Sequence, residues 1–171
     1  KEAEAAISEM EEKYHVLVEA FPQAIAIFQD GKVAFANLGS ARIFGYDHPD
    51  EMIGVSILDH VAEKDRARLG EYAQRRLADD SSLPDRYTAM FRRRDGREFP
   101  GEIFAKRIMY HSRPAIQAIG FDITERRNAE EALRESEEKY RSLVESADEA
   151  IATIDRSGTI LLLNSVAARR L

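Results

Sequence analysis

The chain has 171 residues, of which 44% are hydrophobic and 33% are charged, and its formal net charge is −6. This length suits one domain of ordinary size with extensions. The negative charge argues against nucleic acid as the main partner, because phosphate binding needs a basic surface. There is no cysteine, which excludes disulfides, zinc–thiolate sites and thiol catalysis.

The first segment of the chain, residues 1–21, is acidic and is predicted to form an amphipathic helix rather than a signal peptide. Its apolar residues are spaced 4, 3, 4, 3 and 4 apart, the heptad pattern of paired helices: Ala3, Ile7, Met10, Tyr14, Leu17 and Phe21. The seam is short, so the helix packs either on its own domain or on a second copy. We favour a contribution to a homodimer.

Two short apolar runs, residues 23–28 and 32–37, flank the turn pair Asp30-Gly31 and predict a β-hairpin. Residues 40–77 read as short helical pieces broken by glycine and proline. No stretch approaches the roughly 18 apolar residues that cross a bilayer. We therefore expect no membrane contact from this chain and a cytoplasmic location.

Three strand candidates follow a polar loop, at residues 86–94, 97–108 and 113–124. The basic run Arg92-Arg93-Arg94 precedes the turn pair Asp95-Gly96 and is interpreted as a solvated strand end. Two strands, several short helices and three further strands predict an α+β fold. Its core is a five-stranded antiparallel sheet with short helices on one face.

Alternation along the strands places many small residues on the face beneath the helices. Such a floor could leave a cavity, or large side chains from the helices, such as Ile57, could fill the space. The candidate pocket residues are Phe44, Leu69, Tyr72, Tyr87, Ala89, Ile103, Ile116 and Ala118. We expect the tyrosine hydroxyls among them to offer hydrogen bonds to a small organic ligand, such as a carboxylate or a fatty acyl chain.

The opposite face of the sheet is predicted to be apolar as well, with Met90, Phe104, Ile119 and Phe121. A sheet face without helices is normally polar, so this one needs a cover. The helix over residues 1–21, from the same chain or a partner, is the candidate. The predicted dimer residues are Ile7, Met10, Tyr14, Leu17, Phe104, Ile119 and Phe121.

The sequence contains an internal repeat. The segment from Glu11 recurs from Glu137, 126 residues later, and Asn37 corresponds to Asn164. We expect a piece of a longer protein with tandem domains, divided as follows: an N-terminal helix 1–21, a complete domain 22–124, a linker helix 125–147 and the start of a second domain 148–171. The hairpin of the second copy lacks its sheet, so we expect it to dock elsewhere or to be poorly ordered.

Several motifs in combination resemble a PAS domain, the sensory module of bacterial and archaeal signalling proteins. They are EEKYHVLVEAFPQAIAIF, Asn37 with ARIFGYDHPDEMIG, EKDR, RRDGREFP and GFDITERR, between Glu11 and Arg127. The resemblance implies a non-enzymatic sensory module that dimerises and relays a signal in a histidine kinase or a cyclic-dinucleotide enzyme. The alternative is a domain that binds a small organic ligand or a non-covalent redox flavin as its signal.

The resemblance also implies that Asp122, Thr124 and Arg126 relay the signal into the output helix. Thr124 could cap that helix by accepting a backbone N–H. Asp122 could pair with a nearby arginine such as Arg126, or with the helix N-terminus. The segment from Phe121 to Ser157 has no glycine or proline, which favours a rod over a flexible tether.

Coloured cofactors fit this sequence poorly. Haem-binding members use a histidine near the last middle helix, but residues 65–82 contain none. We interpret the four histidines as surface or capping residues: His15, His48, His60 and His111. The photochemical flavin adduct needs a cysteine. No metal site or catalytic constellation is evident, so any catalysis is expected downstream of Leu171.

Overall fold

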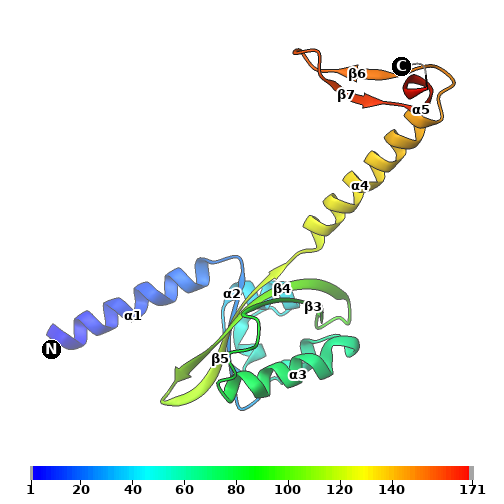
Figure 1. The fold of residues 1–171 in the computed structure, drawn as a ribbon. Coiled ribbons are helices and arrows are strands. Elements are labelled where there is room, and N and C mark those ends of the chain that lie inside the picture. The colour runs from blue at the N-terminus through cyan, green and yellow to red at the C-terminus, as the bar shows by residue number, and fades with distance from the viewer. Residues whose placement is uncertain (1, 170–171) are drawn as a thin grey trace. The chain divides into compact units, whose positions relative to one another are not determined.

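The structure is a computed structural model that describes residues 2–169, with side chains for all of these except residues 2–8 and 11. The chain divides into two compact units, Lys1–Thr124 and Glu125–Leu171. Helix α1 (Glu2–Ala20) begins the first unit (Figure 1). Within the described residues, neither unit has a helix that is both long and apolar enough to span a bilayer.

The first unit is an α+β domain built on a five-stranded antiparallel sheet of order β2-β1-β5-β4-β3, which confirms the predicted fold class. The strands are β1 (Ala24–Gln29), β2 (Lys32–Ala36), β3 (Arg86–Arg92), β4 (Glu98–Tyr110) and β5 (Arg113–Asp122). The chain between β2 and β3 covers one face of this sheet with α2 (Leu38–Phe44), the 3₁₀ turns η1 (Pro49–Met52) and η2 (Ile57–His60), and α3 (Glu63–Leu77) (Figure 1).

The hairpins follow from local turn chemistry. Asp30 and Gly31, between β1 and β2, have φ values of 53° and 75°, the left-handed conformation that a two-residue hairpin turn requires. The longer β4–β5 hairpin reverses at His111 and Ser112, with φ values of 46° and 59°. The turn over His111 agrees with the predicted hairpin loop, and it brings the central strands of the sheet together.

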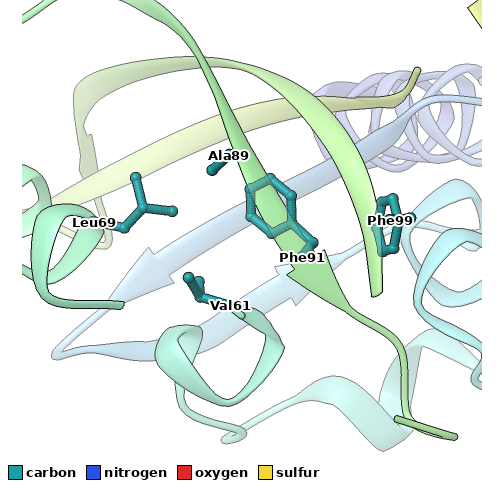
Figure 2. Packing of buried hydrophobic residues seen from close by; sticks show 5 residues of the cluster. All are labelled: Val61, Leu69, Ala89, Phe91 and Phe99. Carbon is teal, nitrogen blue, oxygen red and sulfur yellow. The ribbon is translucent and has the colours of Figure 1, made fainter. Parts of the chain in front are cut away.

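The hydrophobic core lies between the sheet and the helices of the first unit. One cluster consists of Val61, Leu69, Ala89, Phe91 and Phe99 (Figure 2). The Phe91 ring packs over Gly101 so closely that a Cβ on that glycine would lie 2.6 Å from a ring carbon. Burial of these apolar side chains stabilises the domain by about 25 cal/mol for each Å² removed from water.

A buried asparagine joins α1 to the sheet. The side chain of Asn37 is fully buried, and its Nδ2 donates to the carbonyls of Val18, at 3.0 Å, and Gln23, at 3.1 Å. Its Oδ1 accepts the backbone N–H groups of Ile25 and Ser40, each at 2.9 Å. One side chain therefore fixes the last turn of α1, the first strand and the start of α2 to one another.

The second unit contains α4 (Thr124–Glu145), whose first residue closes the first unit, followed by β6 (Ala152–Ile154), β7 (Ile160–Leu163) and α5 (Ser165–Ala168). The strands β6 and β7 form a two-stranded sheet. Ile154, Ile160 and Leu161 are 61%, 50% and 65% exposed. That this hairpin docks elsewhere stays a prediction.

The asparagine junction occurs in both units. In the second, Asn164 donates to the carbonyls of Val144 and Glu149 at 3.1 Å and 2.8 Å. A glutamate at the end of the preceding helix supports it each time: Glu19 accepts from the Leu38 N–H at 2.7 Å, and Glu145 from the Ser165 N–H at 2.9 Å. The internal repeat thus has the same hydrogen-bonded junction in both copies.

Candidate functional site

A cavity of about 80 Å³ lies between the sheet and its helical cover. Its floor consists of small residues on three adjacent strands, because the register places Ala26 of β1 and Ala105 of β4 opposite Ala118 of β5. Ala24 faces Gly120 in the same way. Side chains this short leave space above the sheet that larger residues would occupy.

Large side chains from the helices form the roof, among them Phe44, Ile57, Leu69 and Tyr72. The Phe44 ring centroid lies 6.2 Å from that of Phe91. These side chains narrow the space above the sheet without filling it. The small-residue floor and the bulky cover that the sequence suggested therefore occur together.

The predicted pocket residues Phe44, Leu69, Tyr72, Tyr87, Ile103, Ile116 and Ala118 all line the cavity. Ala89 is not among the lining residues, and that it contacts a ligand stays a prediction. Its short side chain belongs to the core cluster with Leu69 and Phe91 (Figure 2). The Tyr72 and Tyr87 rings are 5.3 Å apart and nearly perpendicular.

His60 also lines the cavity, which corrects its interpretation as a surface or capping residue. The ring is only 8% exposed, its Nε2 lies 3.1 Å from the Tyr46 hydroxyl, and its centroid lies 4.9 Å from that of Phe44. Burial lowers the pKa of His60 below its ordinary value. A single histidine at the end of a short turn has no periodicity that could have indicated this orientation.

Arg76 is a second lining residue that the sequence analysis missed. It is 6% exposed. Its Nη2 donates to the Pro84 carbonyl at 2.7 Å, and its Nη1 donates to Asp85 at 3.1 Å. Arg76 follows Leu69 and Tyr72 at helical spacing, so the apolar stripe of α3 could have indicated that it faces the sheet.

The end of β5 is held by a network around Asp122. Its Oδ2 accepts from Arg93 Nη2 at 2.6 Å, and its Oδ1 accepts from the Thr124 N–H at 2.9 Å and from the Thr124 hydroxyl at 2.6 Å. Partial burial acts to raise the pKa of Asp122, but the bonds from Thr124 and the Arg93 guanidinium hold this pKa below its ordinary value.

This network bears on three expectations. Asp122 accepts from the N–H of the first residue of α4, as the expected pairing with the helix N-terminus implies, and its arginine partner is Arg93. That Arg126 takes part in the relay stays a prediction. Thr124 donates to Asp122 instead of accepting a backbone N–H. Arg93 is not only a solvated strand end, since it also donates to the Ile43 carbonyl and lies 4.4 Å above the Phe99 ring.

Two apolar surfaces of the first unit are partly exposed among the described residues. On the outer face of the sheet, Phe104 is 39% exposed and lies 5.9 Å from the Phe121 ring, with Ile119 opposite Phe104 on the neighbouring strand. On α1, the seam residues Met10, Tyr14 and Leu17 are 59%, 63% and 57% exposed. The side chain of Ile7, also predicted to lie in the seam, is outside the described residues.

The described residues contain no cluster of three or more acidic, histidine or cysteine side chains that could hold a metal ion. The charged side chains of the site are instead paired with one another or with backbone groups. The site combines space for a ligand in the cavity with a hydrogen-bond network at the end of β5.

Comparison with protein families gives two matches. Residues 22–125 match a family described as PAS domain, as the sequence resemblance predicted. Residues 138–171 match a second family with the same description, in agreement with the internal repeat. No curated protein matches the chain.

Solved structures show the same fold. The PAS domain of an HTR-like protein from Haloarcula marismortui has a TM-score of 0.58 and 23% identity, covering 71% of this chain and 98% of that one. A sensory box histidine kinase/response regulator from Burkholderia thailandensis has a TM-score of 0.53 and 19% identity, covering 76% and 98%. An RNA-binding light-oxygen-voltage receptor has a TM-score of 0.59 and 16% identity, covering 77% and 38%.

Proposed function

The chain belongs to the PAS domain family, and on that premise we propose that its complete domain is a sensory module that relays the state of its cavity to helix α4. The observation that carries the proposal is the position of Arg93. Its guanidinium contacts the Ile43 carbonyl of α2, the Phe99 ring of β4 and the Asp122 carboxylate at the end of β5. Ile43 and Phe99 line the cavity.

The relay works through shared contacts. An occupant that displaces Ile43 or Phe99 would shift the Arg93 guanidinium, because the guanidinium contacts both residues. Because the same guanidinium bonds Asp122, and Asp122 bonds the first residue of α4, the displacement alters the hydrogen bonds at the start of that helix. A helix start that loses such bonds frays or reorients, which is a two-state element of the kind that signalling needs.

Hydrogen exchange tests the relay. We expect Arg93→Gln to increase amide exchange over residues 125–130, since Asp122 loses its charged partner. Arg94→Gln is the matched control, because the neighbouring Arg94 pairs with Glu51 at 2.7 Å on the surface and does not contact Asp122. Equal exchange in the two variants would remove Arg93 from the relay.

We also propose that the module forms a homodimer through the seam of α1 and the outer face of the sheet. Exposed side chains such as Leu17 and Phe104 are apolar, and their burial between two copies would be favourable. Light scattering tests this with Leu17→Glu, which is expected to give monomers. Val16→Glu is the control, since Val16 is similarly exposed, at 60%, but lies off the seam. A monomeric unmodified chain would contradict the proposal.

The second candidate function is ligand sensing, and the cavity favours it. A volume of about 80 Å³ is smaller than the roughly 300–1,000 Å³ of typical pockets for drug-sized ligands. The size supports a small organic molecule over a flavin. Binding of such a molecule and relay through Arg93 are compatible, since the first supplies the signal that the second transmits.

We place the module in a longer cytoplasmic signalling protein. The second PAS match begins within α4, which supports a tandem arrangement with further domains downstream. Solved PAS-fold neighbours include sensor histidine kinases, so a histidine kinase or a cyclic-dinucleotide enzyme is our proposal for the output. We assign any catalysis to that output domain.

A further inference from the structure

The wall of the cavity is electrostatically asymmetric. Its lining includes one residue that is charged at every pH of interest, Arg76, and no aspartate or glutamate. His60, the other titratable base, has a pKa lowered by burial and is neutral at pH 7. The remaining lining residues are apolar or hydroxyl-bearing. The wall of the cavity therefore contains one permanently charged residue, a cation, and no carboxylate.

The nearest acidic group balances Arg76 only in part. The Arg76 side chain is 7% exposed, whereas that of Asp85 is 61% exposed. A carboxylate so open to water is screened and neutralises a buried cation weakly. The guanidinium also has more N–H donors than its bonds to Asp85 and Pro84 use. A buried cation in this state gains from a further anionic acceptor.

A second hydrogen-bond donor, the hydroxyl of the partly buried Tyr87, lines the same cavity as Arg76. No hydrogen bond joins this hydroxyl to another of the described residues. Burial raises the pKa of Tyr87 above its ordinary value, although the charges of Arg76 and Arg68 act to lower it, so the hydroxyl stays protonated. Tyr72 packs edge-on against the same ring. This end of the cavity can donate from two side chains to one acceptor.

The rest of the lining suits an apolar group. Phe28, Val33 and Met52 line the cavity together with the floor of Ala26 and Ala118. An alkyl chain on this surface would be removed from water at a gain of roughly 0.8 kcal/mol for each CH₂. The cavity thus combines an apolar body with one cationic, hydrogen-bonding end.

From this arrangement we propose that the cavity binds a small organic carboxylate, with Arg76 and Tyr87 bonding the carboxylate and the alanine floor holding its alkyl part. The inference rests on the proposed ligand-sensing function and specifies the chemical class of the ligand. It also gives Asp85 a role, because this exposed carboxylate competes with the ligand for Arg76.

A purely structural role for Arg76 is the rival explanation, since its bonds tie the Pro84 loop to α3. The two explanations make different predictions about how binding depends on the charge of the ligand. A structural arginine makes the domain less stable when it is changed but gives no preference between an acid and the matching alcohol. An anchoring arginine creates that preference, and the removal of its competitor Asp85 strengthens it.

The experiment measures binding of butanoate, hexanoate and octanoate, and of the alcohols of equal chain length, to the 171-residue chain by NMR titration at pH 7. At the best chain length we expect the acid to bind at least tenfold more tightly than the alcohol. Arg76→Gln is expected to remove this preference, and Asp85→Asn is expected to increase the affinity for the acid several-fold. Ala118→Phe, which fills the floor, is expected to abolish binding of both.

Circular dichroism at the temperature of the titration tests whether each variant is folded. Because Asp85→Asn keeps the arginine in place, it tests the anchor even if Arg76→Gln fails to fold. Acid and alcohol binding with equal affinity, or an Asp85→Asn variant with unchanged acid affinity, would overturn the anionic ligand but leave ligand sensing in place. Binding of neither series to the unmodified chain would overturn both, while the Arg93 relay would still stand on its exchange test.

Discussion

The side-chain amide of Asn37 donates a hydrogen bond of 3.0 Å to the Val18 carbonyl, so a residue at the end of the first hairpin holds the last turn of α1. Asn164 makes the corresponding bond of 3.1 Å to Val144 in the second unit. Each asparagine is fully buried, and its amide bonds groups from the preceding helix end and from the hairpin. The position of each helix end therefore depends on this amide group together with the supporting glutamate.

We expect Asn37→Ala to lower the free energy of unfolding of the first unit by about 3–5 kcal/mol, since several buried backbone groups lose their partner at about 1–3 kcal/mol each. Urea denaturation with hydrogen exchange over residues 16–36 measures the loss. Asn164→Ala is the matched control and is expected to affect residues 144–167 instead. A loss below about 1 kcal/mol in Asn37→Ala would show that water replaces the amide.

The bonds at Asp122 predict a pH dependence at the start of α4. The pKa of Asp122 is lower in the folded domain than its ordinary value of 3.8, so its ionised form stabilises the fold above that value. This contribution is lost as the pH falls through the lower, folded pKa. The NMR shift of the Thr124 amide reports the titration. Asp122→Asn is expected to abolish it, and a titration that persists in this variant would assign the effect to another group.

His60 predicts a loss of stability in mild acid. Its pKa in the folded domain lies below the ordinary 6.5 because burial disfavours the charged ring. Between the two values the unfolded chain binds a proton that the folded domain does not, so the free energy of unfolding falls as the pH drops below 6.5. The hydrogen bond with the Arg92 carbonyl and the charge of Asp59 act to raise this pKa, and the charge of Arg92 acts to lower it.

Urea denaturation from pH 7.5 to 5 measures this slope. His60→Phe keeps a ring against Phe44 and is expected to flatten it. His48→Gln, at an exposed position, is expected to leave the slope unchanged. If the slope were the same in His60→Phe as in the unmodified chain, the burial of His60 would not be its cause.

Two glycines are expected to respond to alanine in opposite directions. In Gly101→Ala the new Cβ would lie 2.6 Å from the buried Phe91 ring, and such overpacking costs about 1–3 kcal/mol. In Gly70→Ala, inside α3, the Cβ would meet a Leu58 methyl at 3.8 Å, an ordinary contact, and the helix gains about 0.5–1 kcal/mol. Thermal unfolding of both variants checks this, and a stabilised Gly101→Ala would show that Phe91 can move aside.

Much of the fold and of the cavity could be predicted from local patterns. Alternation along β3, β4 and β5 indicated which residues share the inner face, because the side-chain period of a strand is two. The turn pair Asp30-Gly31 indicated the first hairpin, and the repeat indicated the second asparagine. The floor at Ala118 was predictable because it depends only on strand assignment and register.

The hydrogen bonds of the site were harder to predict. Arg126 was a plausible partner of Asp122 because the two residues are close in the chain. Arg93 instead lies in the turn between β3 and β4, and it bonds Asp122 because β4 pairs with both β3 and β5. His60 turns inward because the chain between two 3₁₀ segments packs against the sheet. Such contacts depend on how the helices and strands pack against one another, which the periodicity of the sequence does not indicate.

By itself, the sequence determined the α+β class, the strand faces, the repeated asparagine and the small-residue floor, since each rests on local pattern, period or repeat. Only the tertiary structure decided that Arg93 joins the cavity wall to Asp122, and that Arg76 lies buried at one end of an otherwise uncharged cavity. These relationships join residues from different elements. Their distances are set by sheet register and helix packing, which no single segment of the chain specifies.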